Sequence, residues 1–146
     1  MAITQFKGEY RFLSNFYKVD ITFKDQVWPS SEHLFQASKS EDPAVRETIR
    51  LAMTPGETKA AGRKIKLRKD WEEVKVGVMK YILRLKFEQH PDLRNKLIGT
   101  SPHELIEGNN WHDNFWGNCS CRSCYSKPGQ NVLGKLLMEL REELTK

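Results

Sequence analysis

The segment DWEEVKVGVMKYILRLKF, residues 70–87, constrains the fold of this chain more than any other stretch. Asp70 and Glu73 can form a capping box at its start, and Pro91 lies just beyond its end. Its apolar side chains recur every three or four residues, as on one face of an α-helix: Trp71, Val74, Val78, Ile82 and Leu85. A long helix with one buried face is therefore predicted here.

Further helices are predicted on both sides of this segment. Asp42 with Pro43 is typical of a helix start, because aspartate caps free N–H groups and proline suits the first helical position. The T-x-x-E pattern from Thr54 indicates another start, with an end at Gly62. Two more helices are expected, one at 101–108 and one at the C-terminus, where leucines have helical spacing: Leu133, Leu136, Leu137, Leu140 and Leu144.

The segment VDITFKDQVW, residues 19–28, predicts a short β-hairpin. Its apolar and polar residues alternate up to Phe23, and a turn is expected at 24–26. Together with the helices, this predicts an α+β fold, with a single, mostly helical domain over residues 1–146. A short N-terminal β-hairpin or small sheet is the only β-structure expected.

Composition excludes some classes of protein. Apolar residues make up 38% of the chain and charged residues 29%, and no stretch approaches the length of a membrane-spanning helix. The N-terminal residues MAITQFKGEYRF lack the apolar core of a signal peptide, so a cytoplasmic location is expected. No membrane partner is predicted.

The net charge of +5 favours anionic partners. Much of the surplus lies in GRKIKLRKDW, where five positive side chains occur in seven residues: Arg63, Lys64, Lys66, Arg68 and Lys69. This strip is either a solvated loop or a surface that faces phosphate, and the sequence alone does not favour one.

The segment WPSSEHLFQASK, residues 28–39, combines apolar residues with several functional groups. Ser30 or Ser31 can cap a helix here, which would place Glu32, Gln36 and Lys39 on one face together with a phenylalanine. Glu32 and Lys39 would then stand roughly 10 Å apart along the axis, enough for a small organic group between them. The alternative is a solvated face with one weak ion pair.

All three cysteines lie in CSCRSC, within a long segment between the last two predicted helices (residues 108–131). Such a loop is usually functional or disordered, and its four large aromatic residues argue against disorder. With a nearby histidine the cysteines have the pattern H-x6-C-x-C-x2-C, a chemically reasonable zinc ligand set: His112, Cys119, Cys121 and Cys124. Free thiols are favoured because this spacing is not that of a familiar zinc motif, so no cofactor is expected.

Taken together, several motifs resemble those of the NADAR or YbiA-like family. They are FLSNFY, WPSSEHLFQASK, GR followed by DWEEVK, LRLKFEQHPDLRNKL, DNFWG and NVLGKLLMELRE, and they run in family order from about Phe12 to Arg141. The resemblance covers nearly the whole chain. No single motif would be specific by itself.

The resemblance implies hydrolysis of an N-glycosidic bond between ribose C1 and a base nitrogen. Some members remove ADP-ribose from guanine in nucleic acid, and others cleave phosphoribosylamino-pyrimidines of riboflavin synthesis. The partner would then be ADP-ribosylated nucleic acid or a phosphorylated, nucleotide-like small molecule. The sequence does not indicate an oligomeric state.

Three residues are candidates for catalysis. Cleavage of the C1–N bond builds positive charge on the sugar, which a carboxylate stabilises, and Glu32 and Asp113 are the candidates. Lys39 could form a Schiff base with a ring-opened sugar if its pKa is lowered, or act as an electrostatic clamp. We predict Glu32 as a proton shuttle and Asp113 as a second carboxylate.

Other residues are candidates for substrate binding. Trp28, Trp71 and Trp116 could stack on the base, although Trp71 fits a core position at the start of its helix better. Arg63 and the N-terminus of the last helix, after Asn131, could meet phosphate, or Asn131 could only be an N-cap. The remaining candidates line the same motifs: Phe12, Ser14, Asn15, Gln36 and Gly117.

ADP-ribosylated guanine is the favoured substrate, with the riboflavin intermediates as the alternative. Where riboflavin-linked members have a glycine-rich stretch after Trp-Gly, this chain has NCSCRSCYSKPGQN, which bears on substrate choice. A non-catalytic module for ADP-ribose or NAD is a further possibility, but the set of Glu32, Lys39 and Asp113 argues against it. Plain nucleic-acid binding is least favoured, because no groove-reading motif is present.

Overall fold

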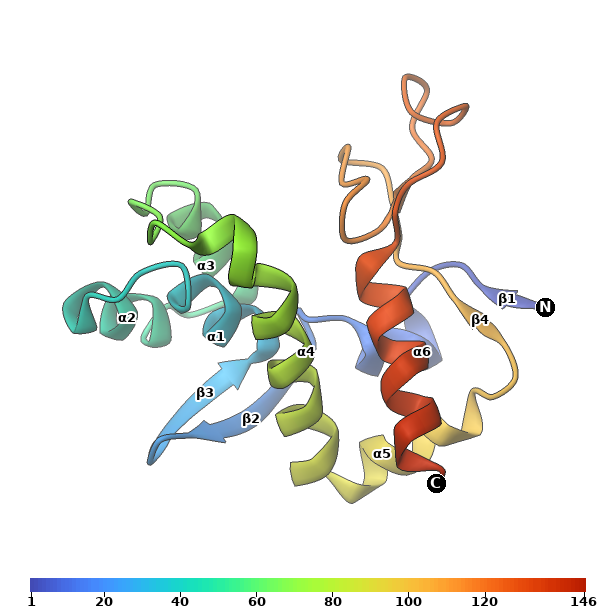
Figure 1. Cartoon of the computed structure of the whole chain (residues 1–146), viewed down its shortest axis with the longest axis horizontal. Helices are drawn as coiled ribbons and strands as arrows, with labels where there is room; N and C mark the ends of the chain where they lie inside the picture. The colour runs from blue at the N-terminus through green and yellow to red at the C-terminus, as the bar shows by residue number, and fades with distance from the viewer. The chain divides into compact units, whose positions relative to one another are not determined.

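The computed structural model describes all 146 residues, which form two compact units. One unit comprises Asn15–Gln89, and the other combines Met1–Ser14 with His90–Lys146 (Figure 1). Helices make up about half of the chain, and each sheet has two strands. The predicted α+β, mostly helical fold is confirmed.

The predicted hairpin opens the unit Asn15–Gln89. Strands β2 (Lys18–Phe23) and β3 (Gln26–Ser30) pair in antiparallel register. The two residues between them, Lys24 and Asp25, have φ angles of 50° and 65°. Two successive residues with positive φ are typical of the tight turn that matches the twist of a hairpin.

Three short helices follow the hairpin, and each starts at the residue that the sequence predicts. The side chains of Ser30, Asp42 and Thr54 each accept a hydrogen bond from a backbone N–H of the first turn. Proline occupies the first helical position of the second and third helices. The helices are α1 (Ser31–Ala37), α2 (Pro43–Arg50) and α3 (Pro55–Gly62).

The long predicted helix is α4 (Trp71–Gln89), which packs against α1 and β2. Its buried face includes Met79, Ile82 and Phe87. The Asp70 carboxylate before this helix pairs with the Arg68 guanidinium at 2.6 Å. No helix of the protein has both the length and the apolar character needed to cross a membrane.

The second unit contains the remaining helices and four two-residue strands. Strand β1 (Ala2–Ile3) pairs in parallel with β4 (Glu104–Leu105), and β5 (Gly108–Asn109) pairs in parallel with β6 (Asn118–Cys119). Buried leucines from α5, β4 and α6 contribute to its core. The helical elements are the 3-10 helix η1 (Gly8–Leu13), α5 (Pro91–Gly99) and α6 (Val132–Leu144).

The helix predicted at 101–108 is wrong. Its backbone is extended at Glu104–Leu105, where Ile106 N donates to Ile3 O at 2.9 Å. The pairing with the N-terminal strand is non-local, so the local capping pattern gives no sign of it. The helix Pro91–Gly99 was not predicted as a separate element.

Lys86 is buried inside the unit Asn15–Gln89, although lysine is rarely buried completely. Its ammonium lies 5.2 Å from the Phe87 ring centroid and 5.7 Å from that of Tyr17. Burial lowers the pKa of Lys86 to about 7. The neutral amine is therefore the form that the fold favours.

We predict that this burial makes stability depend on pH. The pKa of lysine in the unfolded chain is about 10.4, so between about pH 7 and pH 10 the unfolded state binds more protons than the folded state. The free energy of unfolding should therefore rise across this range, and Lys86→Met should remove that part of the rise. Urea unfolding at about pH 7 and pH 9 measures it, with the exposed Lys80→Met on the same helix as control. Equal pH slopes in the two variants would contradict the prediction.

Candidate functional site

Helix α1 is the structural basis of the candidate site. All seven of its residues are buried, because the helix packs against β3, α2, α3 and α4. Its N-terminus is fixed by Ser30, whose hydroxyl accepts from His33 N at 3.1 Å and lies 2.7 Å from His33 Nδ1. Any polar side chain on this helix is therefore held in a defined position.

Glu32 and Gln36, which the sequence places on one face of this helix, are in direct polar contact. Gln36 Nε2 donates to Glu32 Oε2 at 2.8 Å, and the two side chains are only 6% and 5% exposed. The backbone also joins Glu32 to the first predicted motif, because Glu32 N donates to Asn15 O at 3.0 Å. The alternative of a solvated helix face does not apply to this carboxylate.

Lys39 lies in the turn that follows α1, where its N–H donates to Gln36 O at 3.2 Å. Partial burial lowers its pKa below the ordinary value of lysine, and the charges of Arg63 and Lys59 lower it further, whereas Glu32 raises it. Lys39 is thus within electrostatic reach of Glu32. The lowered pKa increases the fraction of neutral amine, which is the nucleophilic form.

Gly62 brings helix α3 into close approach with Gln36. A Cβ atom at this position would lie 1.9 Å from Gln36 Oε1 and 2.6 Å from Gln36 Cδ. The glycine therefore leaves space for the Gln36 amide. Arg63, the next residue and the C-cap of α3, is exposed.

Several buried polar atoms in the FLSNFY and WPSSEHLFQASK motifs have no hydrogen-bond partner in the protein. They are Asn15 Oδ1, Trp28 Nε1, Ser31 Oγ and Gln36 Oε1. Leaving a buried polar atom unpaired costs about 1–3 kcal/mol, so native folds keep few of them. Four such atoms on the predicted motifs are typical of a ligand-binding region.

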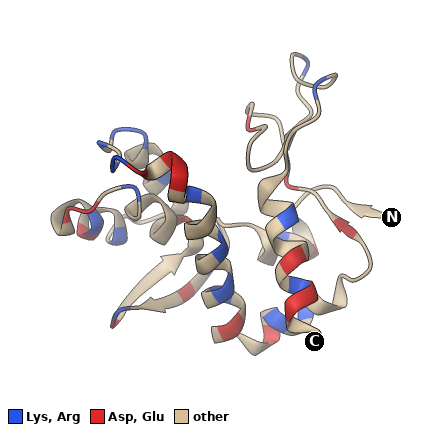
Figure 2. Ribbon diagram, in the orientation of Figure 1, with Lys and Arg blue, Asp and Glu red and all other residues tan.

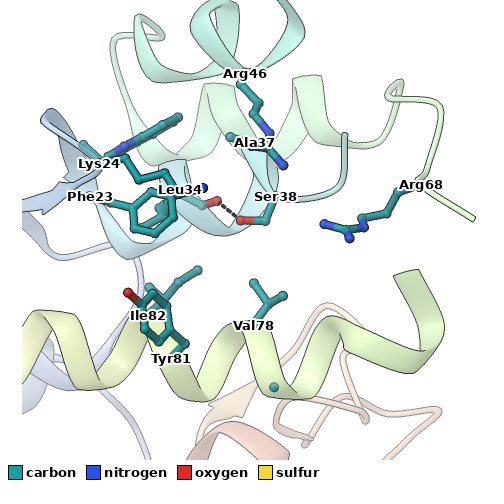
Figure 3. A pocket seen from close by; sticks show the side chains of 12 residues that line it. Phe23, Lys24, Leu34, Ala37, Ser38, Arg46, Arg68, Val78, Tyr81 and Ile82 are labelled. Atoms are coloured by element: carbon teal, nitrogen blue, oxygen red, sulfur yellow. Dashed lines mark hydrogen bonds between the residues drawn. The ribbon is translucent and has the colours of Figure 1, made fainter. Parts of the chain in front are cut away.

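A cavity of about 360 Å³ lies on the opposite side of α1 (Figure 3). Leu34, Ala37 and Ser38 face it, about half a helical turn from Glu32. It is also lined by Trp28 of β3, by Arg46 of α2 and by residues of β2 and α4. Trp28 therefore faces this cavity, and a base that stacks on Trp28 would bind in it.

Trp71 lies at the start of α4 and is buried. Its ring packs on Phe35, with ring centroids 5.2 Å apart and an interplanar angle of 54°. Trp71 therefore occupies a core position. A role for Trp71 in base stacking stays a prediction.

Positive side chains gather in the connection between α3 and α4 (Figure 2). Arg68 in this segment is engaged by Asp70 at 2.6 Å and by Glu41 at 3.4 Å. Four others are exposed: Arg63, Lys64, Lys66 and Lys69. This arrangement suits an anionic ligand of extended size, because an exposed cation keeps its donors available.

Asp113 lies in the other unit, in the long segment between β5 and β6. Its Oδ1 accepts from Phe115 N at 3.2 Å and from Trp116 N at 2.9 Å, and its backbone oxygen accepts from Asn109 Nδ2 at 2.8 Å. These bonds fix the turn that carries the DNFWG motif. Its role as a second carboxylate in catalysis stays a prediction.

Trp116 and Gly117 follow in the same turn. The Trp116 ring packs edge-on against Phe115, with centroids 4.8 Å apart, and is half-buried. Gly117 is required by close packing, since a Cβ there would lie 2.1 Å from Glu107 O. Gly117 thus has a structural role, and a contact with substrate stays a prediction for both residues.

Asn131 is the N-cap residue of α6, as one alternative from the sequence expects, but its side chain makes no capping hydrogen bond. Its Oδ1 accepts from Glu107 N and its Nδ2 donates to Leu105 O, both at 2.9 Å, and its φ angle is 50°. The expectation of free N–H groups for phosphate at the start of α6 is wrong. Val132 N and Leu133 N already donate to the carbonyl oxygens of Phe115 and Trp116.

Phe12 and Ser14 belong to the same unit as Asp113. Phe12 is buried, and the Lys96 ammonium lies 5.8 Å from its ring centroid. Ser14 is the C-cap of η1, and its N–H donates to Arg11 O at 3.0 Å. These contacts describe their packing, and substrate binding by either residue stays a prediction.

The structure thus brings together part of the predicted set. On α1 and beside it lie Glu32, Gln36, Lys39, Arg63 and the backbone of Asn15. Sequence reasoning missed Lys59 and gave the glycine of the GR motif only the role of ending a helix, although a glycine inside a helical pattern often signals close packing. The potential metal ligands also lie together: His112, Cys119, Cys121 and Cys124.

Comparison with known proteins decides the family. Residues 4–145 match the family described as the NADAR domain. The chain belongs to the NADAR family. This confirms the resemblance that the motifs carry.

Relatives of this NADAR protein cover nearly its whole length. N-glycosidase YbiA from Escherichia coli (strain K12) is 44% identical over 138 residues, which are 93% of this chain and 82% of the relative. The NMR structure of E. coli YbiA matches with a TM-score of 0.85 at 41% identity, covering 99% of this chain and 84% of that one. A riboflavin biosynthesis protein of Vibrio vulnificus is 38% identical over 91% of this chain and 35% of its own length.

We predict that Gly62→Ala destabilises this NADAR protein by about 1–3 kcal/mol, because the added methyl group displaces the buried Gln36 amide. Gly56→Ala, in the same helix, is the matched control, since its Cβ meets nothing closer than Thr54 Oγ1 at 3.8 Å. That change should be neutral or stabilising. Urea unfolding of both variants measures the difference in the free energy of unfolding. Equal stabilities would show that the close approach to Gln36 does not require glycine at position 62.

Proposed function

We propose that this protein is an N-glycosidase that removes ADP-ribose from ADP-ribosylated guanine in nucleic acid. Its family and the relatives named N-glycosidase support hydrolysis of an N-glycosidic bond. The observation that carries the chemistry is the buried pair of Glu32 and Gln36, next to a lysine with a lowered pKa. The choice of ADP-ribosylated guanine as substrate depends on a separate feature, the distribution of positive charge.

Glu32 suits the charge changes of the reaction. Breaking the bond between ribose C1 and the base nitrogen builds positive charge on the sugar, and a buried carboxylate stabilises that charge more than an exposed one would. The hydrogen bond from Gln36 orients the carboxylate. Glu32 can also carry a proton between the sugar ring oxygen, the leaving nitrogen and water.

Lys39 offers a covalent route when the leaving nitrogen is an exocyclic amine. Opening of the sugar ring converts the C1–N bond into an imine, and the neutral Lys39 amine adds to C1. The base amine then leaves with a proton, and the sugar stays on Lys39 as a new imine. Water hydrolyses this imine, which returns the free amine and releases the sugar, whose ring closes again.

The distribution of positive charge favours the larger substrate. ADP-ribose on nucleic acid carries a pyrophosphate and flanking phosphates, whereas a phosphoribosylamino-pyrimidine carries one phosphate group. Lys59 and Arg63 act on Lys39 electrostatically, and three exposed lysines follow them: Lys64, Lys66 and Lys69. This set offers more cations than one phosphate group needs.

The riboflavin intermediates are the second candidate substrate. The relative from Vibrio vulnificus that is named a riboflavin biosynthesis protein supports this alternative. A non-catalytic module for ADP-ribose or NAD is the third. A module would bind an anion with cations alone, so the buried Glu32 would have no purpose in it.

The test compares two substrates: an oligonucleotide with ADP-ribosylated guanine and the phosphoribosylamino-pyrimidine. We expect release of ADP-ribose to be the faster reaction, and Glu32→Gln to lower it at least about a hundredfold with affinity little changed. Glu41→Gln, a change in an exposed carboxylate of the same unit, should leave the rate unaltered.

The outcomes separate the three functions. Turnover of the pyrimidine alone would support the second candidate, and binding without turnover of either substrate would support the module. Full activity of Glu32→Gln would remove this carboxylate from the mechanism. Asp113→Asn, measured in parallel, tests the second carboxylate. Lys39→Arg keeps the charge but cannot form the imine, so activity retained there would leave Lys39 only an electrostatic role.

A further inference from the structure

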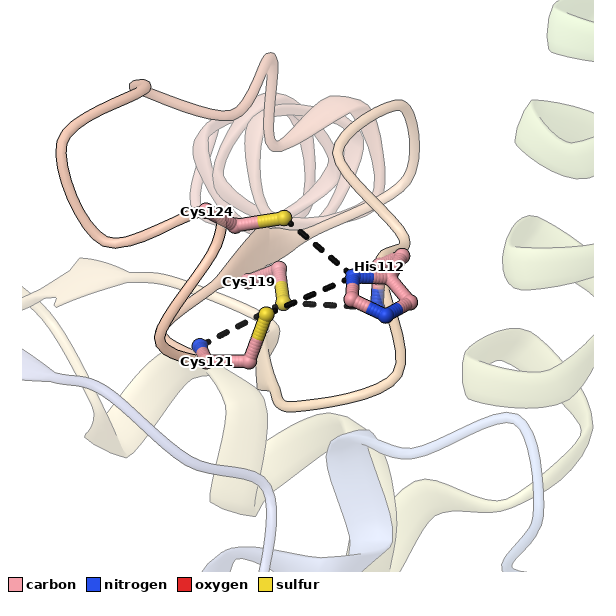
Figure 4. Close-up of side chains that lie close together, drawn as sticks. All are labelled: His112, Cys119, Cys121 and Cys124. Carbon is pink, nitrogen blue, oxygen red and sulfur yellow. Dashed lines mark hydrogen bonds between the residues drawn. The ribbon is translucent and has the colours of Figure 1, made fainter.

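Four potential metal ligands converge in the segment between β5 and α6 (Figure 4). The ligand atoms of His112, Cys119, Cys121 and Cys124 all lie within 4.8 Å of one another. His112 Nδ1 is 3.3 Å from Cys121 Sγ and 3.4 Å from Cys124 Sγ. All four residues come from one stretch of thirteen.

These distances are close to those of a tetrahedral zinc site. Zn–S bonds of about 2.3 Å and Zn–N bonds of about 2.0–2.1 Å place neighbouring ligand atoms about 3.5–3.8 Å apart. The His112 nitrogen is already within a few tenths of an ångström of this separation from two sulfur atoms. Three thiolates and one imidazole are also a known ligand set of structural zinc.

The backbone around the cluster supports thiolates rather than thiols that merely pack together. His112 N donates to Cys119 Sγ at 3.3 Å, and Cys121 N donates to the same sulfur at 3.5 Å. An N–H group that points at sulfur stabilises negative charge there, as do the outer-shell hydrogen bonds of metal sites. His112 has a φ angle of 70°, an uncommon conformation for a residue other than glycine.

We propose that His112, Cys119, Cys121 and Cys124 bind one Zn²⁺ ion as a structural centre of this loop. The sequence favours free thiols because the spacing H-x6-C-x-C-x2-C is unfamiliar. Spacing along the chain, however, does not give the distances between the ligand atoms. The structure supplies that geometry. Binding replaces the thiol protons by the metal, so three protons at most are released for each ion bound.

The centre would order the segment that carries the DNFWG motif. His112 directly precedes Asp113, and Asn114 Oδ1 accepts from Cys119 N at 2.8 Å. A metal bond to residues at both ends of this turn restricts the Asp113 and Trp116 positions without contacting substrate. The proposal does not depend on which substrate the enzyme cleaves.

The first test is the metal content of the full-length protein, expressed in zinc-supplemented medium and purified under reducing conditions without chelator. Elemental analysis should find about one zinc per chain. Cys121→Ser and His112→Ala should each lower zinc affinity at least about tenfold. Ser120→Ala and His103→Ala are matched controls outside the ligand set, and they should retain the metal.

The second test uses the parent protein alone, in case the variants fold poorly. After the metal is removed by a chelator, titration with Co²⁺ should give the visible absorption bands of tetrahedral cobalt–thiolate coordination, and Zn²⁺ should displace them. The melting temperature should rise when Zn²⁺ is added back. Absence of zinc together with absence of the cobalt spectrum in reduced, folded protein would overturn the proposal. So would a disulfide among the three cysteines in metal-free protein as isolated.

Discussion

The burial of a carboxylate on the short helix α1 is the interaction on which the candidate site depends. A buried charge is costly unless hydrogen bonds and an opposite charge compensate for it, and Glu32 has Gln36 at 2.8 Å and Lys39 within electrostatic reach. The position of Gln36 also explains the glycine at position 62, because the absence of a side chain there leaves room for the Gln36 amide. The fold thus places a carboxylate on a helix whose residues are all buried and an amine of lowered pKa in the turn that follows it.

The segment between β5 and α6 is ordered in a different way. It has few regular elements, and its backbone groups are paired instead by side chains and by the start of α6, as with Asn131 and the N–H groups of Val132 and Leu133. Gly117 and Gly129 allow strands of the loop to approach closely. Long loops retain a fixed shape when such bonds replace secondary structure, and the proposed metal would add a further constraint.

Local chemistry made part of this structure predictable from the sequence. The caps Ser30, Asp42 and Thr54 act within one helical turn, so the sequence contains all that determines them. Non-local contacts escaped prediction. The pairing of Leu105 with Ile3 converted an expected helix into a strand, and the roles of Gly62 and Asn131 depend on partners more than twenty residues away. The resemblance to the NADAR family predicted a functional role for the Glu32 motif, whereas its spacing alone left a solvated face possible.

We propose that Lys39 reacts with the sugar beside Glu32, and trapping with borohydride is the most direct test of this step. The enzyme is treated with borohydride during turnover of whichever substrate it cleaves, and the product is located by peptide mass spectrometry. Reduction of the imine should leave the sugar bound to Lys39, with Lys69→Arg behaving like the parent and Lys39→Arg giving no adduct. Full turnover without an adduct, or an adduct on another lysine, would show that Lys39 does not form the imine.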